Sequence, residues 1–223
     1  MADGFGRLAG IYEGLEHLAY GGLLMRARTA FLTELQSARN ILVLGEGDGR
    51  FLVKLLAANP NCSVTVLDSS AGMLRRAEAR LSSALPEARP RVTFQQQDAL
   101  TATLLPNAYD ALVTCFFLDV FPASELEQLI FRLERTLKPG GLWLLADFAA
   151  PQTLERPLVR LYSQLMVPLM YTFFRLQTAL PARTLVPPQP FLQQVGLELN
   201  TSKTFRGGFV YAALWRKPEA DRD

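Results

Sequence analysis

Cysteine and histidine are the scarcest of the chemically reactive residues in this sequence. The 223 residues include two cysteines, Cys62 and Cys115, and one histidine, His17. Two cysteines are too few for a disulfide framework or a structural zinc site, and a lone histidine leaves a histidine-based metal site short of ligands. The composition therefore predicts a metal-free protein of a reducing compartment, and we expect a cytoplasmic location.

The sequence also lacks a strong excess of one charge. Its 23 Lys and Arg residues are nearly balanced by 21 Asp and Glu residues, which gives a net charge of +2. Non-specific binding to nucleic acid depends on a strongly basic field, and this balance does not provide one. We therefore expect no nucleic-acid partner.

No apolar run is long enough for a membrane span. The most apolar stretch, residues 161–174, holds 14 uncharged residues, whereas a transmembrane helix needs about 20. Residues 1–10 lack the basic start and apolar core of a secretory signal. We expect no transmembrane span, while peripheral contact of the apolar stretch with a membrane or lipid stays open.

The composition is that of an ordinary globular chain. Hydrophobic residues make up 49% and charged residues 20% of the sequence, so burial can offset the entropy lost on ordering. At roughly 150 residues per domain, the length predicts one sizeable domain with an appendage.

From residue 40 onward the hydrophobic pattern alternates between strands and helices. The expected strands are 41–44, 63–67, 92–95, 111–118 and 142–146, and the expected helices between them are 51–58, 71–85 and 124–137. Two further strands, 197–205 and 209–215, flank Gly207-Gly208 and predict an antiparallel hairpin. Two amphipathic helices precede residue 40. The pattern is typical of a doubly wound α/β fold of seven strands.

Two local signals mark the helix expected at 124–137. Ser124 followed by Glu127 has the spacing of a capping box at its start. Pro139-Gly140-Gly141 is expected to end it, because proline cannot continue a helix and glycine accepts a left-handed turn.

A glycine-rich segment follows the first strand of this pattern. Residues 45–50 read GEGDGR and lead directly into a helix. Glycines permit positive φ and close approach of a ligand, and the helix N-terminus offers unpaired N–H groups. Arg50 stands where a dinucleotide fingerprint has its third glycine, which disfavours a nicotinamide oxidoreductase, and no phosphate-binding G-K-[ST] follows.

Two carboxylates end the next two strands. Asp68 follows the second strand, 19 to 23 residues beyond the three glycines, where a carboxylate can accept both hydroxyls of a ribose. Asp98 follows the third strand. Because parallel strands end at one edge of an open sheet, both residues are expected beside the same crevice.

Five ordered segments resemble the class I S-adenosylmethionine-dependent methyltransferases: GEGDGR, VTVLDSSAGML, FQQQDAL, YDALVTCFFLDVF and LKPGGLWLLADF. The resemblance covers residues 40–148, extends through the final hairpin, and leans towards the ubiquinone/menaquinone methyltransferase branch of small-molecule enzymes. It implies a Rossmann-like, mostly parallel seven-stranded sheet with N-terminal helices and a helical lid insertion. It also implies S-adenosylmethionine as cofactor and S-adenosylhomocysteine as product.

The resemblance further implies which residues bind the cofactor. The family commonly has an acid two residues before the first glycine, where this chain has Val43, so Glu46 or Asp48 is expected to receive the methionine ammonium. The implied cofactor residues are Gly45, Glu46, Gly47, Asp48, Gly49, Asp68, Ser69, Met73, Asp98, Ala99, Cys115 and Phe116.

Methyl transfer is an in-line displacement that needs a base only when the acceptor must lose a proton. The candidate bases are Asp119, ranked first because it follows the fourth strand, with Asp147, His17 and the tyrosines of the lid. Asp119 capping a helix and His17 facing solvent are the alternatives. Substrate contacts are expected from aromatic and methionine residues of the N-terminal helices and the lid, for which simple packing is the alternative: Tyr12, Tyr20, Tyr162, Met166, Met170 and Phe173.

These observations predict one methyltransferase domain over residues 1–223. Its parts are an N-terminal helical cap (1–39), a cofactor-binding core (40–148), a helical lid (149–190) and a C-terminal helix and hairpin (191–216). The expected acceptor is small and hydrophobic: a quinone, polyketide, terpenoid, or lipid-like phenol or amine. A catalytically silent scaffold of the same fold is the alternative function, and a homodimer closing the lid stays open.

Overall fold

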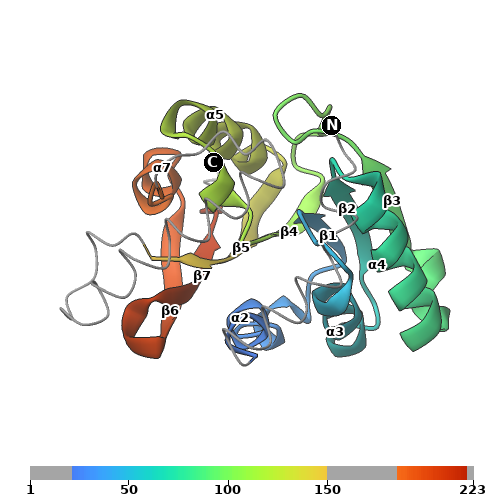
Figure 1. The fold of residues 1–223 in the computed structure, drawn as a ribbon. Helices are drawn as coiled ribbons and strands as arrows, with labels where there is room; N and C mark the ends of the chain where they lie inside the picture. The colour runs from blue at the N-terminus through green and yellow to red at the C-terminus, as the bar shows by residue number, and fades with distance from the viewer. Residues whose placement is uncertain (1–21, 150–184, 220–223) are drawn as a thin grey trace.

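The computed structural model describes residues 22–149 and 185–219, which form a seven-stranded sheet flanked by helices (Figure 1). The strand order is β3-β2-β1-β4-β5-β7-β6. The strands are β1 (Asn40–Leu44), β2 (Ser63–Asp68), β3 (Val92–Gln96), β4 (Tyr109–Cys115), β5 (Leu137–Phe148), β6 (Glu198–Phe205) and β7 (Val210–Arg216). The doubly wound α/β fold expected from the sequence is confirmed.

The sheet reverses its winding direction between β1 and β4. From β1 the chain adds β2 and then β3 on one side, and afterwards adds β4 and β5 on the other, all in parallel. β7 then pairs antiparallel with β5 and with β6. In open sheets of this kind, ligands bind beyond the carboxyl ends of the strands at the reversal point. The carboxyl ends of β1 and β4 therefore locate the candidate site.

Helices cover both faces of the sheet. On one face lie α2 (Leu23–Arg28), α3 (Arg50–Ala58) and α4 (Ala71–Ala84), and on the other lie α5 (Ala123–Glu134) and α7 (Gln189–Gln194). Alternate residues of β1 serve the two cores, because successive strand side chains point to opposite faces: Ile41 and Val43 face one, Leu42 and Leu44 the other. This explains why the central strand is apolar throughout.

The helix expected at 124–137 begins and ends differently from its predicted limits. The capping box was wrong: α5 starts at Ala123, and Pro122 is its N-cap without a side-chain hydrogen bond. The fixed φ of proline already sets the extended entry, and the Pro122 carbonyl accepts the N–H of Leu126 at 2.9 Å. At the other end, Lys217 Nζ donates to the Glu134 carbonyl at 3.2 Å and stabilises the helix terminus.

Two turns also differ from expectation. Pro139-Gly140-Gly141 lies within β5 rather than ending a helix, and the Gly140 N–H donates to the Lys217 carbonyl at 3.0 Å. The hairpin between β6 and β7 spans residues 206–209 instead of two glycines, since Arg206, Gly207 and Gly208 all have positive φ.

The second of the two helices expected before residue 40, whose apolar positions are Leu24, Ala27, Phe31 and Leu35, is broken in two. α2 ends at Arg28, and a short 3-10 helix follows at Thr33–Leu35. The Thr29 hydroxyl donates to the Met25 carbonyl at 2.8 Å, where it takes an acceptor of the helix end.

The domain parts proposed from the sequence stay predictions, since most of the cap and lid falls in residues 1–21 and 150–184, outside the described structure. No helix within the described residues is long and apolar enough to cross a membrane.

The segment between α2 and β1 is tied to α3 by one buried amide. The Asn59 side chain, 1% exposed, donates to the Leu35 and Ala38 carbonyls, both at 2.8 Å. This contact fixes the chain that carries α2 towards the sheet.

We expect Asn59→Ala to lower the free energy of unfolding by about 2 to 4 kcal/mol, because it leaves two buried carbonyls unpaired. Urea unfolding measures the loss. Asn61→Ala, at an exposed neighbouring position, is the control and should change stability by less than about 0.5 kcal/mol. Equal effects of the two substitutions would contradict this role of Asn59.

Candidate functional site

The loop after β1 combines tight packing with open space. Gly47 has φ +77, and a Cβ added there would meet nothing within 4 Å. Gly49 has φ +88, and its Cβ would lie 2.7 Å from the Ala77 Cα. Gly49 therefore lets α4 pack closely against the loop, while Gly47 leaves the backbone approachable by a ligand.

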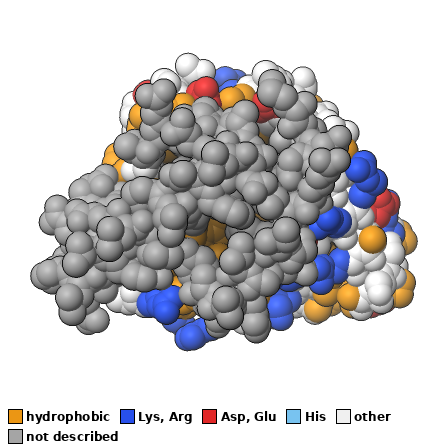
Figure 2. Space-filling model, in the orientation of Figure 1, with side chains coloured by type: hydrophobic (Ala, Val, Ile, Leu, Met, Phe, Trp, Pro, Cys, Tyr) orange, Lys and Arg blue, Asp and Glu red, His pale blue; other side chains and the backbone are white. Residues whose placement is uncertain are grey.

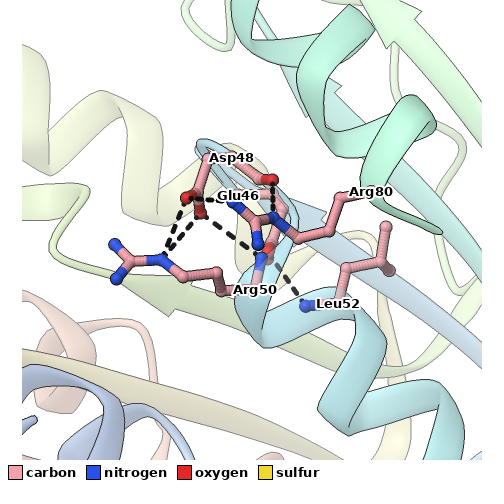
Figure 3. Close-up of polar contacts among 5 residues, drawn as sticks. All are labelled: Glu46, Asp48, Arg50, Leu52 and Arg80. Atoms are coloured by element: carbon pink, nitrogen blue, oxygen red, sulfur yellow. Dashed lines mark hydrogen bonds and ion pairs between the residues drawn. The ribbon is translucent and has the colours of Figure 1, made fainter. Parts of the chain in front are cut away.

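Glu46 is buried beneath this loop. The residue is only 4% exposed, and its Oε1 accepts the Leu52 N–H of α3 at 2.9 Å (Figure 3). Burial raises the pKa of Glu46 to about 7, although the Leu52 N–H and the charge of Arg28 oppose the shift. Glu46 is thus a carboxyl that gains strongly from a nearby positive charge.

Asp48, the second acid of the loop, is held by arginines. Figure 3 shows its carboxylate between Arg50 of α3 and Arg80 of α4, with the Arg80 Nη2 at 3.1 Å from Oδ2. Its charge is used to join the loop to α4. Of the two acids expected to receive an ammonium, Glu46 is therefore the better placed. Val43, at the family's usual acidic position, is buried in the core at 2% exposure.

A buried arginine faces the end of β4. Arg28, the last residue of α2, is 8% exposed and lies 5.3 Å from the centre of the Phe116 ring. Phe116 follows β4 with φ +54 and packs on Phe148 at 5.0 Å between ring centres. Beside it, burial raises the pKa of the Cys115 thiol to about 12, so this thiol is protonated.

Arg28 was missed in the sequence analysis. A signal was present, because Arg28 occupies a position on the apolar side of the helical pattern that includes Leu24, Ala27 and Phe31. A charge on the buried face of a helix indicates a special environment.

Asp68 is the last residue of β2, and Asp98 lies two residues after β3, so both are at strand ends as expected. Asp68 Oδ1 accepts the Ser70 N–H at 2.9 Å, and burial raises the pKa of Asp68 against hydrogen bonds from Ser70 and Gly47. The Asp68 carbonyl accepts the Gln97 N–H at 3.2 Å, which joins the ends of the two strands.

The residues expected around the adenine flank these strand ends. Asp98 is exposed and accepts the Leu100 N–H at 2.9 Å, while Ala99 is buried. Ser69 directly precedes Ser70, the N-cap of α4, whose hydroxyl accepts the Met73 N–H at 3.3 Å. The structure thus gathers both strand ends and the start of α4 at one place.

Two of the expected bases form a pair. Asp119, in the 3-10 turn Leu118–Val120, and Asp147, near the end of β5, are 6% and 1% exposed. Their carboxyl groups lie close enough to share a hydrogen bond. Burial raises the pKa of both, and repulsion from Asp119 raises that of Asp147 further. Because two adjacent carboxylates cannot both ionise cheaply, the pair retains one proton near neutral pH.

Tyr211 completes this cluster and was not expected from the sequence. It lies opposite Asp147 in the antiparallel pairing of β7 with β5. Burial raises the pKa of its phenol, and the charges of Asp147 and Asp119 add to the shift. Its placement depends on a strand pairing between residues 64 positions apart, which no local pattern reveals.

The remaining site predictions lie outside the described residues. These are His17, Tyr12, Tyr20, Tyr162, Met166, Met170 and Phe173.

A cavity of about 400 Å³ opens between α2, α3 and α4. Lys and Arg side chains are visible in the lower half of the face in Figure 2, the side on which α2 and α3 lie in Figure 1. The cavity's basic residues are Arg50, Lys54 and Arg80, two of which are engaged by Asp48. It shares those arginines with the glycine loop but none of the strand-end carboxylates.

The fold and the site together define a doubly wound α/β protein whose residues at the sheet reversal suit a nucleoside ligand. The open side of Gly47 suits close approach of a ribose, and Asp68 suits its vicinal hydroxyls. The buried carboxyl of Glu46 suits an ammonium group. The residues present therefore fit an adenosine ligand that carries an amino-acid end.

Comparison with known proteins agrees with this class. A family model described as a methyltransferase domain matches residues 41–141. The ubiquinone/menaquinone biosynthesis C-methyltransferase UbiE of Syntrophotalea carbinolica is 32% identical over 167 residues, which span 74% of this chain and 68% of that protein. The chain belongs to the class I S-adenosylmethionine-dependent methyltransferases of the small-molecule type, whose cofactor is S-adenosylmethionine.

Solved structures share the fold at lower identity. An O-methyltransferase family protein from Burkholderia thailandensis matches with a TM-score of 0.71 and 17% identity, over 95% of this chain and 59% of its own. The N-methyltransferase NodS from Bradyrhizobium japonicum, in complex with S-adenosylhomocysteine, matches with a TM-score of 0.60 and 16% identity, over 88% and 85%. At such identities the likeness concerns the fold alone.

We expect the stability of the ligand-free protein to depend on pH through Glu46. With a pKa of about 7 when folded and a usual value of 4.5, the folded protein binds more protons than the unfolded chain between these values. The free energy of unfolding therefore falls as the pH rises through this window, by on the order of 1 kcal/mol per pH unit.

Urea unfolding between about pH 5 and pH 8 measures this slope. Glu46→Gln should reduce it, and Asp119 and Asp147, whose pKa values burial also raises, should supply the remainder. Glu198→Gln, on the exposed side of β6, is the control and should retain the wild-type slope. An unchanged slope in Glu46→Gln would contradict the buried, ionisable state of Glu46.

We expect Asp68→Ala to weaken binding of S-adenosylhomocysteine about 10- to 100-fold. The substitution removes an acceptor for ribose hydroxyls, and hydrogen bonds to a charged group contribute about 1.5 to 3 kcal/mol. Isothermal titration calorimetry measures the dissociation constant. Asp68→Asn keeps an oxygen for the Ser70 N–H and should bind with intermediate affinity. Wild-type affinity in Asp68→Ala would exclude Asp68 from the ribose site.

Proposed function

We propose that the protein transfers a methyl group from S-adenosylmethionine to a small, hydrophobic acceptor with a phenol- or quinol-type ring. The observation that carries this proposal is the buried pair of Asp119, just after β4, and Asp147, near the end of β5. It supplies a proton acceptor with a raised pKa beside the cofactor edge of the sheet. An acceptor whose hydroxyl must lose a proton needs such a group.

The surroundings of the pair favour an apolar ring as substrate. Phe117 and Phe121 pack against the same core as Tyr211, and their ring centres are 5.3 Å apart. Asp119 lies in the turn between these two rings, so this aromatic pair and the carboxyl pair adjoin. Aromatic side chains prefer to pack against other aromatic rings. The printed name of the relative from Syntrophotalea carbinolica, a ubiquinone/menaquinone C-methyltransferase, supports a quinone-type acceptor.

In this proposal the cofactor, when bound, supplies an electrophilic methyl group on its sulfonium. Asp119 is the base that accepts the hydroxyl proton of the acceptor. Asp147 keeps the shared proton and, by its hydrogen bond, orients Asp119. Loss of the hydroxyl proton increases electron density on the acceptor, whose oxygen or ring carbon would attack the in-line methyl group as the bond from that methyl to sulfur breaks. A methylated ring carbon would then lose its own proton, which restores the aromatic ring and, with return of a proton to the oxygen, the hydroxyl.

We expect Asp119→Asn to lower kcat for methylation of demethylmenaquinol about 10²- to 10⁴-fold, the usual contribution of a general base. The dissociation constant of S-adenosylhomocysteine should stay within about twofold, because the cofactor residues are untouched. The wild-type rate should rise with pH through about 7, as the Asp119 carboxyl loses its proton. The rate is measured as formation of S-adenosylhomocysteine from S-adenosylmethionine, with a chemically reduced, short-chain quinone as the methyl acceptor.

Glu127→Gln, an exposed carboxyl on neighbouring α5, is the matched control and should keep wild-type kcat. Wild-type kcat in Asp119→Asn would remove Asp119 from the mechanism. Binding of the cofactor with no methylation of quinols, simpler phenols or amines would instead favour the catalytically silent scaffold, which light scattering with candidate partner proteins would then examine.

A further inference from the structure

Arg28 is a buried charge whose hydrogen-bonding capacity is incompletely used. It is 8% exposed, and its Nε forms no hydrogen bond with any of the described residues. Leaving a guanidinium N–H buried without an acceptor is costly. The position therefore indicates an acceptor that arrives with a ligand.

Glu46 lies within electrostatic reach of this guanidinium. Arg28 attracts the Glu46 carboxylate, yet the two form no ion pair among those found in the described chain. Glu46 Oε1 is occupied by the Leu52 N–H. Two buried, opposite charges thus stay near each other without direct contact.

The environment fixes Arg28 in this place. Its guanidinium lies 5.3 Å from the centre of the Phe116 ring, a cation–π contact that restrains its orientation. Phe116 is itself set by a positive φ and by its N–H donating to the Ala146 carbonyl at 2.7 Å. Glu46 follows β1, and Arg28 lies over the ring of Phe116, which follows β4. The charges of Glu46 and Arg28 therefore flank the sheet reversal.

An α-amino-acid group is the chemical complement of such an arrangement, because it carries a carboxylate and an ammonium on the same carbon. We infer that Arg28 binds the α-carboxylate and Glu46 the α-ammonium of the methionine end of the cofactor. This inference rests on the proposed use of S-adenosylmethionine. It assigns to Arg28 a binding role, and it explains how the chain recognises the amino-acid end with Val43 at the family's usual acidic position.

The test compares two ligands that differ in the amino-acid end. S-adenosylhomocysteine carries both charged groups, and 5′-methylthioadenosine carries neither. We expect Arg28→Leu to raise the dissociation constant of S-adenosylhomocysteine about 10- to 100-fold and to leave that of 5′-methylthioadenosine within about twofold. Isothermal titration calorimetry on the full chain gives both constants without a catalytic assay.

Decarboxylated S-adenosylmethionine separates the two charges. Its affinity should be insensitive to Arg28→Leu and should fall in Glu46→Gln, since it retains the ammonium but lacks the carboxylate. Arg26→Leu, an exposed arginine on the same helix, is the matched control and should bind all three ligands as wild type does. Arg28→Lys should recover part of the affinity for S-adenosylhomocysteine.

Equal weakening of S-adenosylhomocysteine and 5′-methylthioadenosine by Arg28→Leu would overturn the inference and make Arg28 a structural residue. If Arg28→Leu does not fold, judged by its circular dichroism and melting temperature, Arg28→Gln and Arg28→Lys carry the same comparison. Failure of the wild type to bind either ligand would overturn the proposed function itself. The two failures are therefore distinguishable.

Discussion

The candidate site depends on how the chain offsets the cost of burying the carboxyl of Glu46, a residue of the loop after β1. The Leu52 N–H at the start of α3 and the charge of Arg28 both favour its ionised form, against the cost of burial. Asp48 would add repulsion, and its own ion pairs with Arg50 and Arg80 limit that. The loop, α2, α3 and α4 are thus arranged around one buried acid.

The same edge of the sheet carries a second set of buried carboxyl groups. The buried carboxyl groups of Asp119, after β4, and Asp147, near the end of β5, interact with each other, and the charge of Asp147 acts on Cys115 together with those of Arg28 and Glu46. The buried charges near the ends of β1 and β5 therefore act on the same residue at the end of β4. In the proposed mechanism this proximity matters, because the methyl group and the proton acceptor must meet at one acceptor molecule.

The sequence predicted the elements of the core well, since their signals are local. The apolar run Ile41 to Leu44 and the glycines after it depend on neighbouring residues, and both expectations held in the described structure. The helix limits near Ser124 and Pro139 were predicted wrongly. The end of α5 is stabilised by Lys217, which meets it only after β7 has paired with β5, whereas its start is set by Pro122, which replaces the expected capping box.

The sequence by itself determined the doubly wound α/β class, the glycine loop and the acids at the strand ends, because periodicity and turn chemistry depend on adjacent residues. Only the tertiary structure decided which acids act together. It placed Glu46 near Arg28, engaged Asp48 with Arg50 and Arg80, and paired Asp119 with Asp147 beside Tyr211. The physical reason is that burial and charge pairing arise from contacts between distant segments, which exist once the sheet has assembled.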